Sequence, residues 1–231
     1  MMIPVRRLAM NTVASMLITG GVLMSPSALA SDYPPAVEAL PPIHIIQPDG
    51  VARSVSLADV FDHHGYACGP ATVAFMAMQY ALQNLYTENE IPRADDLLVL
   101  SHSPGGGVAD VMDLLFSNGR PESRTLRPAG MRNAADSFEF QVMRKSTLQT
   151  VSIALDPALW PAGWFEIRDK RRAGTFTEAD QAQLQSYQQQ VTSTFPAKDL
   201  QTLFGSTEVR TVMGWGAIQS GELEAAVRAQ R

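Results

Sequence analysis

Four histidines and a single cysteine are the residues of this chain best suited to binding a metal. His63 and His64 shortly precede Cys68, and thiolate and imidazole are preferred ligands of zinc and other late transition metals. The spacing of His64 and Cys68, in a loop that enters a helix, lets both side chains reach one ion. This segment therefore predicts a transition-metal site, with zinc as the expected ion.

A third ligand has to come from another segment, because two ligands rarely hold an ion firmly. His102 lies in a glycine-rich loop that follows an apolar run and precedes a helical pattern. That order places the loop at the carboxyl end of a strand, where α/β sites commonly form. We therefore expect the ligands His64, Cys68 and His102, with further candidates His63, Tyr66, Asp62 and Asp110. His44 lies in a proline-rich segment and is not expected to bind.

Three consecutive glycines, Gly105, Gly106 and Gly107, are candidate cofactor-binding residues together with Ser101. The loop lacks both the GK[ST] continuation of a P-loop and the GxGxxG spacing of a dinucleotide site. Because glycine has no Cβ, such a run lets a neighbouring segment or a small ligand approach the backbone closely. That close approach is what the loop predicts.

Cys68 also has two other interpretations. The sequence Cys68-Gly69-Pro70-Ala71 at a helix start resembles the nucleophile region of bacteriocin-processing and other papain-like peptidases, which implies a hydrolase or transferase using Cys68 with His64. The helix N-terminus would lower the pKa of the thiol. Those enzymes carry their base well downstream, whereas no histidine follows His102 here. Alternatively, Cys68 is a small buried residue of a non-catalytic periplasmic binding protein.

Residues 1–30 have the features of a secretory signal. Arg6 and Arg7 precede a mostly apolar stretch, Leu8 to Leu23, that is too short for a stable membrane span. Ala28-Leu29-Ala30 then supplies the small-x-small pattern of a cleavage site. We expect an exported, periplasmic protein that begins at Ser31 and has no membrane-spanning segment. Its lone cysteine excludes an intrachain disulfide.

The composition excludes other classes of protein. Eighteen Lys and Arg residues stand against 23 Asp and Glu, the net charge is −5, and 45% of the residues are hydrophobic. The longest basic cluster is Lys170-Arg171-Arg172, which is expected to be a solvated face. This charge balance argues against a nucleic-acid partner. Without the signal, about 200 residues remain, enough for one core.

The elements that would position these residues follow from hydrophobic periodicity. Residues 31–55 are rich in proline and predict an extended arm packed loosely on a domain of residues 56–231. The predicted elements of that domain are a short helical or irregular piece Ser56–Phe61, a buried helix Ala71–Tyr86, a strand Asp96–Leu100, a helix Val108–Phe116, a hairpin of Ser137–Arg144 with Gln149–Leu155, a surface helix capped by Thr177 that ends near Phe195, and a short helix over 197–204. The expected class is a single α+β domain with a mixed sheet, a buried central helix and a C-terminal helical tail.

Three segments in order resemble the FmdE-like family of formylmethanofuran dehydrogenase proteins. His64–Pro70, followed by the apolar helix, is similar to the family's H-G-H-x-C opening. Ser101–Asp110 and the strand before it resemble its strand–loop–Asp segment. Arg168–Gly174, the helix from Thr177 and the Leu203-Phe204 pair resemble its C-terminal helical tail. The resemblance covers over half of the mature chain and implies an α+β domain that binds a transition metal, often zinc, near the cysteine.

The chain departs from this family pattern at three points. Tyr66 replaces the second histidine, and a phenol is a poorer metal ligand than imidazole. The family's second cysteine and its C-terminal cysteine-rich zinc module are absent, and His102 is the residue that would compensate. Family members occur as accessory or stand-alone proteins beside molybdenum or tungsten enzymes. The expected function is therefore binding of a metal or of a metal-containing cofactor. The expected partner is a metalloenzyme or a small molecule, and a homo-oligomer is compatible with the sequence.

Overall fold

The structure is a computed structural model, and it describes residues 33–120, 125–126, 131–212 and 225. The predicted signal sequence and its cleavage at Ser31 lie outside these residues. The described residues belong to one compact unit, which begins at Tyr33.

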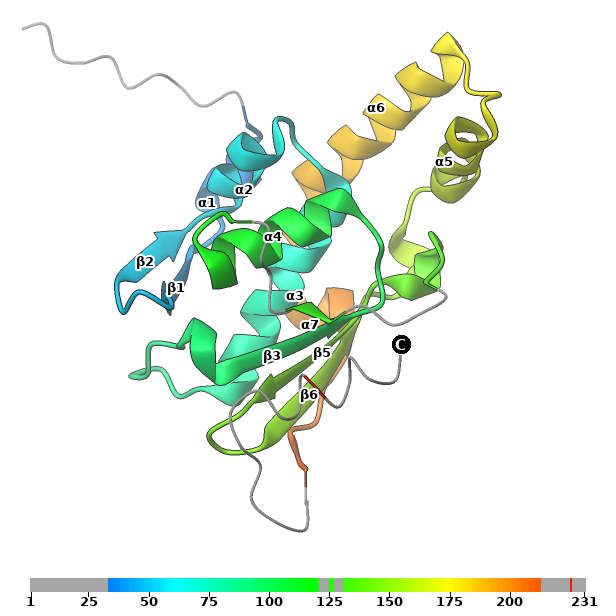
Figure 1. Cartoon of the computed structure of the whole chain (residues 1–231). Helices are drawn as coiled ribbons and strands as arrows, with labels where there is room; N and C mark the ends of the chain where they lie inside the picture. Colours follow the sequence, from blue (N-terminus) through cyan, green and yellow to red (C-terminus); the bar gives the residue numbers. More distant parts are fainter. Residues whose placement is uncertain (1–32, 121–124, 127–130, 213–224, 226–231) are drawn as a thin grey trace, which may run out of the picture. The chain divides into compact units, whose positions relative to one another are not determined.

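Helices and strands alternate irregularly along the chain (Figure 1). The helices are α1 (Pro35–Ala39), α2 (Leu57–His64), α3 (Gly69–Leu85), α4 (Gly106–Ser117), α5 (Trp164–Ala173), α6 (Glu178–Thr194) and α7 (Leu200–Phe204). The strands are β1 (Ile43–Ile46), β2 (Ala52–Val55), β3 (Leu97–Ser101), β4 (Thr125–Leu126), β5 (Glu139–Arg144), β6 (Gln149–Ala154) and β7 (Arg210–Thr211). Short 3-10 turns lie at Ala94–Asp96, Ala135–Ser137 and Pro157–Leu159.

The main sheet has the strand order β4-β3-β5-β6-β7. Strand β3 is parallel to β4 and antiparallel to β5, and the β5–β6 and β6–β7 pairs are antiparallel. Phe140 and Val142 of β5, with Val151 and Ile153 of β6, are buried, as the period-two alternation of a one-sided sheet requires. The predicted hairpin and the mixed sheet of an α+β domain are confirmed.

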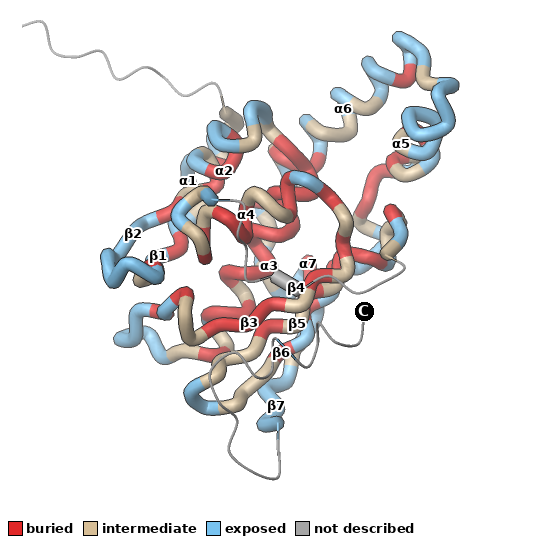
Figure 2. Tube along the Cα trace, viewed as in Figure 1, coloured by how far each residue is buried: buried red, intermediate tan, exposed pale blue. Residues whose placement is uncertain are grey.

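Helix α3 is the buried central helix that the sequence predicts. Every residue from Cys68 to Gln79 is buried (Figure 2). The helix packs on β5 and β6 on one side and on α4, α6 and α7 elsewhere, so no face of its first three turns needs polar residues. It begins at Gly69, two residues before the predicted start, because Pro70 fits the first turn of a helix.

The extended arm predicted for residues 31–55 is wrong from residue 33 onward. Helix α1 buries Val37, and strands β1 and β2 form an antiparallel hairpin. Ile43 and Ile45 of β1 are 4% and 0% exposed. Alternating isoleucines supply a buried strand face. Pro35 begins α1, and the other prolines lie outside β1 and β2, so none interrupts the ladder. This segment is part of the core.

Helix α5 was not among the elements predicted from periodicity, whereas α2, α4, α6 and α7 lie close to their predicted ranges. Helix α4 begins at Gly106, two residues before the predicted Val108. Thr177 caps α6 in a reciprocal capping box with Asp180, as predicted.

Across the described ranges, none of the helices combines the length and the apolar character needed to cross a membrane.

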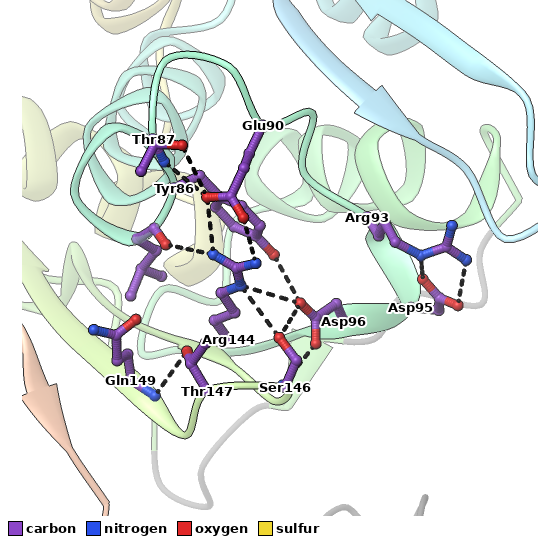
Figure 3. A network of polar contacts seen from close by, with 11 residues as sticks. Tyr86, Thr87, Glu90, Arg93, Asp95, Asp96, Arg144, Ser146, Thr147 and Gln149 are labelled. Carbon is purple, nitrogen blue, oxygen red and sulfur yellow. Dashed lines mark hydrogen bonds and ion pairs between the residues drawn. The ribbon is translucent and has the colours of Figure 1, made fainter.

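Arg144, at the end of β5, joins three segments in a polar cluster (Figure 3). Its guanidinium donates to both carboxylate oxygens of Glu90, at 2.8 and 3.2 Å, and to Asp96 at 3.3 Å. It also donates to the carbonyl of Leu85 and lies 4.1 Å from the ring centroid of Tyr86. Only 17% of the Arg144 side chain is exposed. These contacts tie the end of α3 to the main sheet.

Arg144→Met is expected to lower the free energy of unfolding by about 1–3 kcal/mol, because it leaves the acceptors of several charged hydrogen bonds unpaired. Urea denaturation of the two proteins measures this. The matched control is Arg93→Met, which removes an exposed pair with Asp95 at 3.0 Å and should have no measurable effect. Equal losses in the two variants would mean that the Arg144 cluster has no special role.

Candidate functional site

The candidate site starts at the turn between α2 and α3. A capping box of Ser56 and Asp59 begins α2, and Gly65 ends it with a φ of +91°, a left-handed conformation that favours glycine. This turn places His64 at the end of α2 and Tyr66 two residues later, with their ring centroids 4.4 Å apart. Cys68 follows at the N-cap of α3.

His64 is held by a carboxylate from α4. Its Nδ1 lies 2.5 Å from Oδ2 of Asp110. Because an ionised carboxylate only accepts hydrogen bonds, Nδ1 carries the proton of this bond. In the neutral ring, Nε2 then has a free lone pair. That Nε2 atom is buried and has no hydrogen-bond partner among the described residues. The Nε2 lone pair of His64 is therefore held in a fixed direction and is free to bind a metal ion.

The thiol of Cys68 lies against the glycine run of α4. A Cβ atom on Gly107 would be 2.7 Å from Sγ, which is closer than real contacts allow. On the adjacent Gly106, a Cβ would lie 4.0 Å from Cε1 of His64. His64 and Cys68 therefore lie beside two adjacent glycines in the first turn of α4, His64 at Gly106 and Cys68 at Gly107. The close approach predicted for the glycine run is confirmed at Gly107. The group that approaches its backbone is part of the protein, the start of α3 with the thiol of Cys68.

The predicted low pKa of the Cys68 thiol is wrong. Burial raises the pKa of Cys68 to about 11, and the side chain is 3% exposed. Hydrogen bonds from the Ala71 backbone and the Tyr66 hydroxyl, and the charge of Arg168, lower this pKa but do not outweigh burial. The cost of removing a thiolate from water exceeds the benefit of the helix N-terminus. The metal-free thiol is protonated at neutral pH.

Alkylation of metal-free Cys68 by iodoacetamide should therefore be slow at pH 7. Its rate should rise about tenfold per pH unit toward pH 11, because the thiolate is the reactive form. Mass spectrometry of timed samples measures the rate. The control is the chain in urea, where the rate should level off above an ordinary thiol pKa of about 8.5. A rate in the folded protein that levels off near neutral pH would show that the thiol is activated.

His102 does not join the other two predicted ligands. Its backbone N–H donates to the carbonyl of Glu139 at 3.1 Å, which fixes the start of the loop at the sheet. Its Nε2 is buried and has no partner in the part of the chain that the structure describes. Within that same part, no three His, Cys, Asp or Glu side chains gather closely enough to hold a metal ion. The structure joins His64 to Asp110 and places His64 beside Gly106, next to the glycine that Cys68 contacts, whereas His102 completes no three-ligand group among the described residues.

The other candidates lie elsewhere. His63 and His44 are exposed, and Asp62 accepts a hydrogen bond of 2.6 Å from the hydroxyl of Tyr33. Ser101 is buried, and its hydroxyl accepts from the backbone of Ser103 at 3.3 Å. These side chains serve the fold or face solvent. Tyr66, in contrast, lies beside His64 and Cys68.

Arg168 is a residue of the site that sequence reasoning missed. It lies on α5, half-buried. Burial raises the pKa of both Cys68 and Tyr66, and the charge of Arg168 acts in the opposite direction on both. Burial lowers the pKa of Arg168 itself. One signal in the sequence was usable: Arg168 follows Trp164 by four residues and so shares its helix face. The direction of that face needed the three-dimensional structure.

The comparisons with known proteins add a distant structural likeness. No family model matches the chain, and no curated protein matches it. Among solved structures, the chain is similar to the crystal structure of a tungsten formylmethanofuran dehydrogenase FmdE-like protein from Syntrophus aciditrophicus. The identity is 18%, the match covers 68% of this chain and 72% of the other, and the TM-score is 0.37. This is a distant structural resemblance, and the function rests on the residues of the site.

Proposed function

We propose that this chain binds a transition metal, with zinc as the expected ion, or a metal-containing cofactor, through Nε2 of His64 and Sγ of Cys68. The observation that carries the proposal is the bond between Nδ1 of His64 and Asp110, combined with a buried Nε2 that has no partner among the described residues. Histidines that bind metals characteristically donate their other ring N–H to a carboxylate or carbonyl, which orients the ring.

The donor set fits an open metal site and not a closed structural one. Structural zinc sites use four protein ligands, whereas His64 and Cys68 supply two. The other positions would be filled by His102 after a local movement, or by donor atoms of a bound small molecule. The second arrangement corresponds to a metal-containing cofactor. Since the thiol is protonated when metal-free, binding would release its proton and weaken as the pH falls.

The cellular setting is part of the proposal. We propose export to the periplasm after loss of residues 1–30, and a role as an accessory protein to a metalloenzyme. The alternative function is a hydrolase or transferase with Cys68 as nucleophile. In that case His64 would act as the base, and Asp110 would orient it. A buried thiol with a raised pKa works against it, and the alkylation profile of Cys68 decides between the two functions.

The metal proposal predicts which variants lose affinity. His64→Ala and Cys68→Ser should each weaken zinc binding at least about tenfold, and Asp110→Asn about tenfold, because ligand orientation depends on that carboxylate. His102→Ala should weaken it less than His64→Ala. Competition with a zinc-binding dye at pH 7.5 measures the affinities.

His63→Ala is the matched control, since it removes the neighbouring histidine on the same turn and should bind zinc like the parent. His44→Ala, on strand β1, should also behave like the parent. The proposal fails if His64→Ala binds zinc like the parent while circular dichroism shows it folded. It also fails if the parent binds no zinc.

A further inference from the structure

Helix α5 turns one face toward the start of α3. Trp164 is fully buried, and its ring packs on Gly69 so tightly that a Cβ there would lie 2.9 Å from Cη2. Residues four and seven positions later lie on the same side of a helix. Arg168 and Arg171 therefore follow Trp164 on the face directed at the turn of Tyr66 and Cys68.

The charges on α5 are unevenly paired. Lys170 forms an ion pair of 2.6 Å with Asp180, and Arg172 forms one of 3.3 Å with Asp169. Arg171 lies 5.6 Å from the ring centroid of Phe176. Arg168 is more buried than these three, and it has neither a hydrogen bond nor an ion pair within the described ranges. A half-buried guanidinium without an anion is costly unless a ligand supplies one.

The surroundings of Arg168 favour a negative ligand. Burial raises the pKa of the Tyr66 phenol, and the charges of Arg168 and Arg171, which lie close to it, act in the opposite direction. Asp110 is the carboxylate that also acts on Cys68 and Tyr66, and it is already bonded to His64. Tyr66 is 54% exposed, so molecules from solvent reach this place.

We propose that Arg168, assisted by Arg171 and the hydroxyl of Tyr66, binds the carboxylate or phosphate group of a small anionic ligand beside Cys68. A guanidinium donates two parallel hydrogen bonds to such an oxyanion, and a phenol hydroxyl adds a third. This anion site goes beyond the proposed metal function, because it needs no metal. It would also place the anionic part of a metal-containing cofactor next to the donor atoms of His64 and Cys68.

The test measures anion binding to the full chain with a chelator present, so that it does not depend on the metal. Inorganic phosphate and succinate are titrated separately at constant ionic strength, with chloride as the reference, and binding is followed by isothermal calorimetry. The parent should bind at least one of the two anions. Arg168→Gln should lower that affinity at least about tenfold. The affinity of Arg168→Lys should lie between those of the parent and Arg168→Gln, because lysine keeps the charge but cannot donate two parallel hydrogen bonds.

Arg172→Gln is the matched control: it removes the same charge from the same helix and should bind like the parent. Near-ultraviolet circular dichroism verifies that each variant is folded. Binding of phosphate alone or succinate alone identifies the class of oxyanion. The proposal is overturned if the parent binds neither anion. It is also overturned if Arg168→Gln binds like the parent, or if Arg172→Gln loses as much affinity as Arg168→Gln.

Discussion

Gly107→Ala is expected to lower the free energy of unfolding by about 1–3 kcal/mol, although alanine is the better helix former. The added Cβ would lie 2.7 Å from Sγ of Cys68 and 3.3 Å from the backbone nitrogen of Ala71. The backbone of α3 cannot yield as a flexible side chain would, so α4 has to move away from it. Urea denaturation at pH 7 measures the loss.

Two further variants test the cause of this loss. Gly106→Ala adds the same atom one residue earlier, where the nearest neighbour is Cε1 of His64 at 4.0 Å, and it should leave stability unchanged or slightly raised. Adding Cys68→Ala to Gly107→Ala should restore part of the lost stability, because it removes the closest contact. Without such restoration, the clash with the thiol is not what makes Gly107 necessary.

Trp164→Ala should cost more, about 3–5 kcal/mol of unfolding free energy, as large-to-small changes of buried aromatic residues do. Trp164 is completely buried, and its ring centroid is 4.8 Å from that of Trp160. The indole also fills the space above Gly69, where α5 meets α3. Chemical denaturation followed by far-ultraviolet circular dichroism gives the value.

Trp164→Phe is the graded control, and its loss should be clearly smaller because most of the aromatic packing remains. Trp164 anchors α5 against α3 and so positions Arg168, which lies on the same helix face. Trp164→Ala should therefore also weaken phosphate or succinate binding, measured at a temperature where the variant is folded. A loss below about 1 kcal/mol in Trp164→Ala would contradict the assignment of Trp164 as the anchor of α5.

Local patterns in the sequence predicted most of the fold. The apolar run of α3, the alternation in β5 and β6, and the capping box of Thr177 and Asp180 each depend on residues close together in the chain. The prediction of an extended arm for residues 31–55 was wrong because it relied on the prolines of this segment. The burial of Ile43 and Ile45 depends on packing against distant elements, which composition does not reveal.

The site was predicted in part for the same reason. His64, Cys68 and Asp110 came from recognisable segments, and the structure joins His64 to Asp110. The thiol pKa was misjudged because helix position is visible in the sequence, whereas the degree of burial that outweighs it is not. Arg168 was overlooked because the sequence does not show that its neighbours Lys170 and Arg172 have partners while it has none among the described residues.

X-ray absorption spectroscopy at the zinc edge, on protein loaded with one equivalent of zinc, identifies the atoms that bind the metal. If His64 and Cys68 bind the metal, the spectrum shows one sulfur ligand together with imidazole scattering, and lighter oxygen or nitrogen atoms in the other positions. The sulfur contribution should disappear in Cys68→Ser, and the imidazole contribution should weaken in His64→Ala. A spectrum of the parent without sulfur, or one that stays the same in both variants, would contradict binding of the metal by His64 and Cys68.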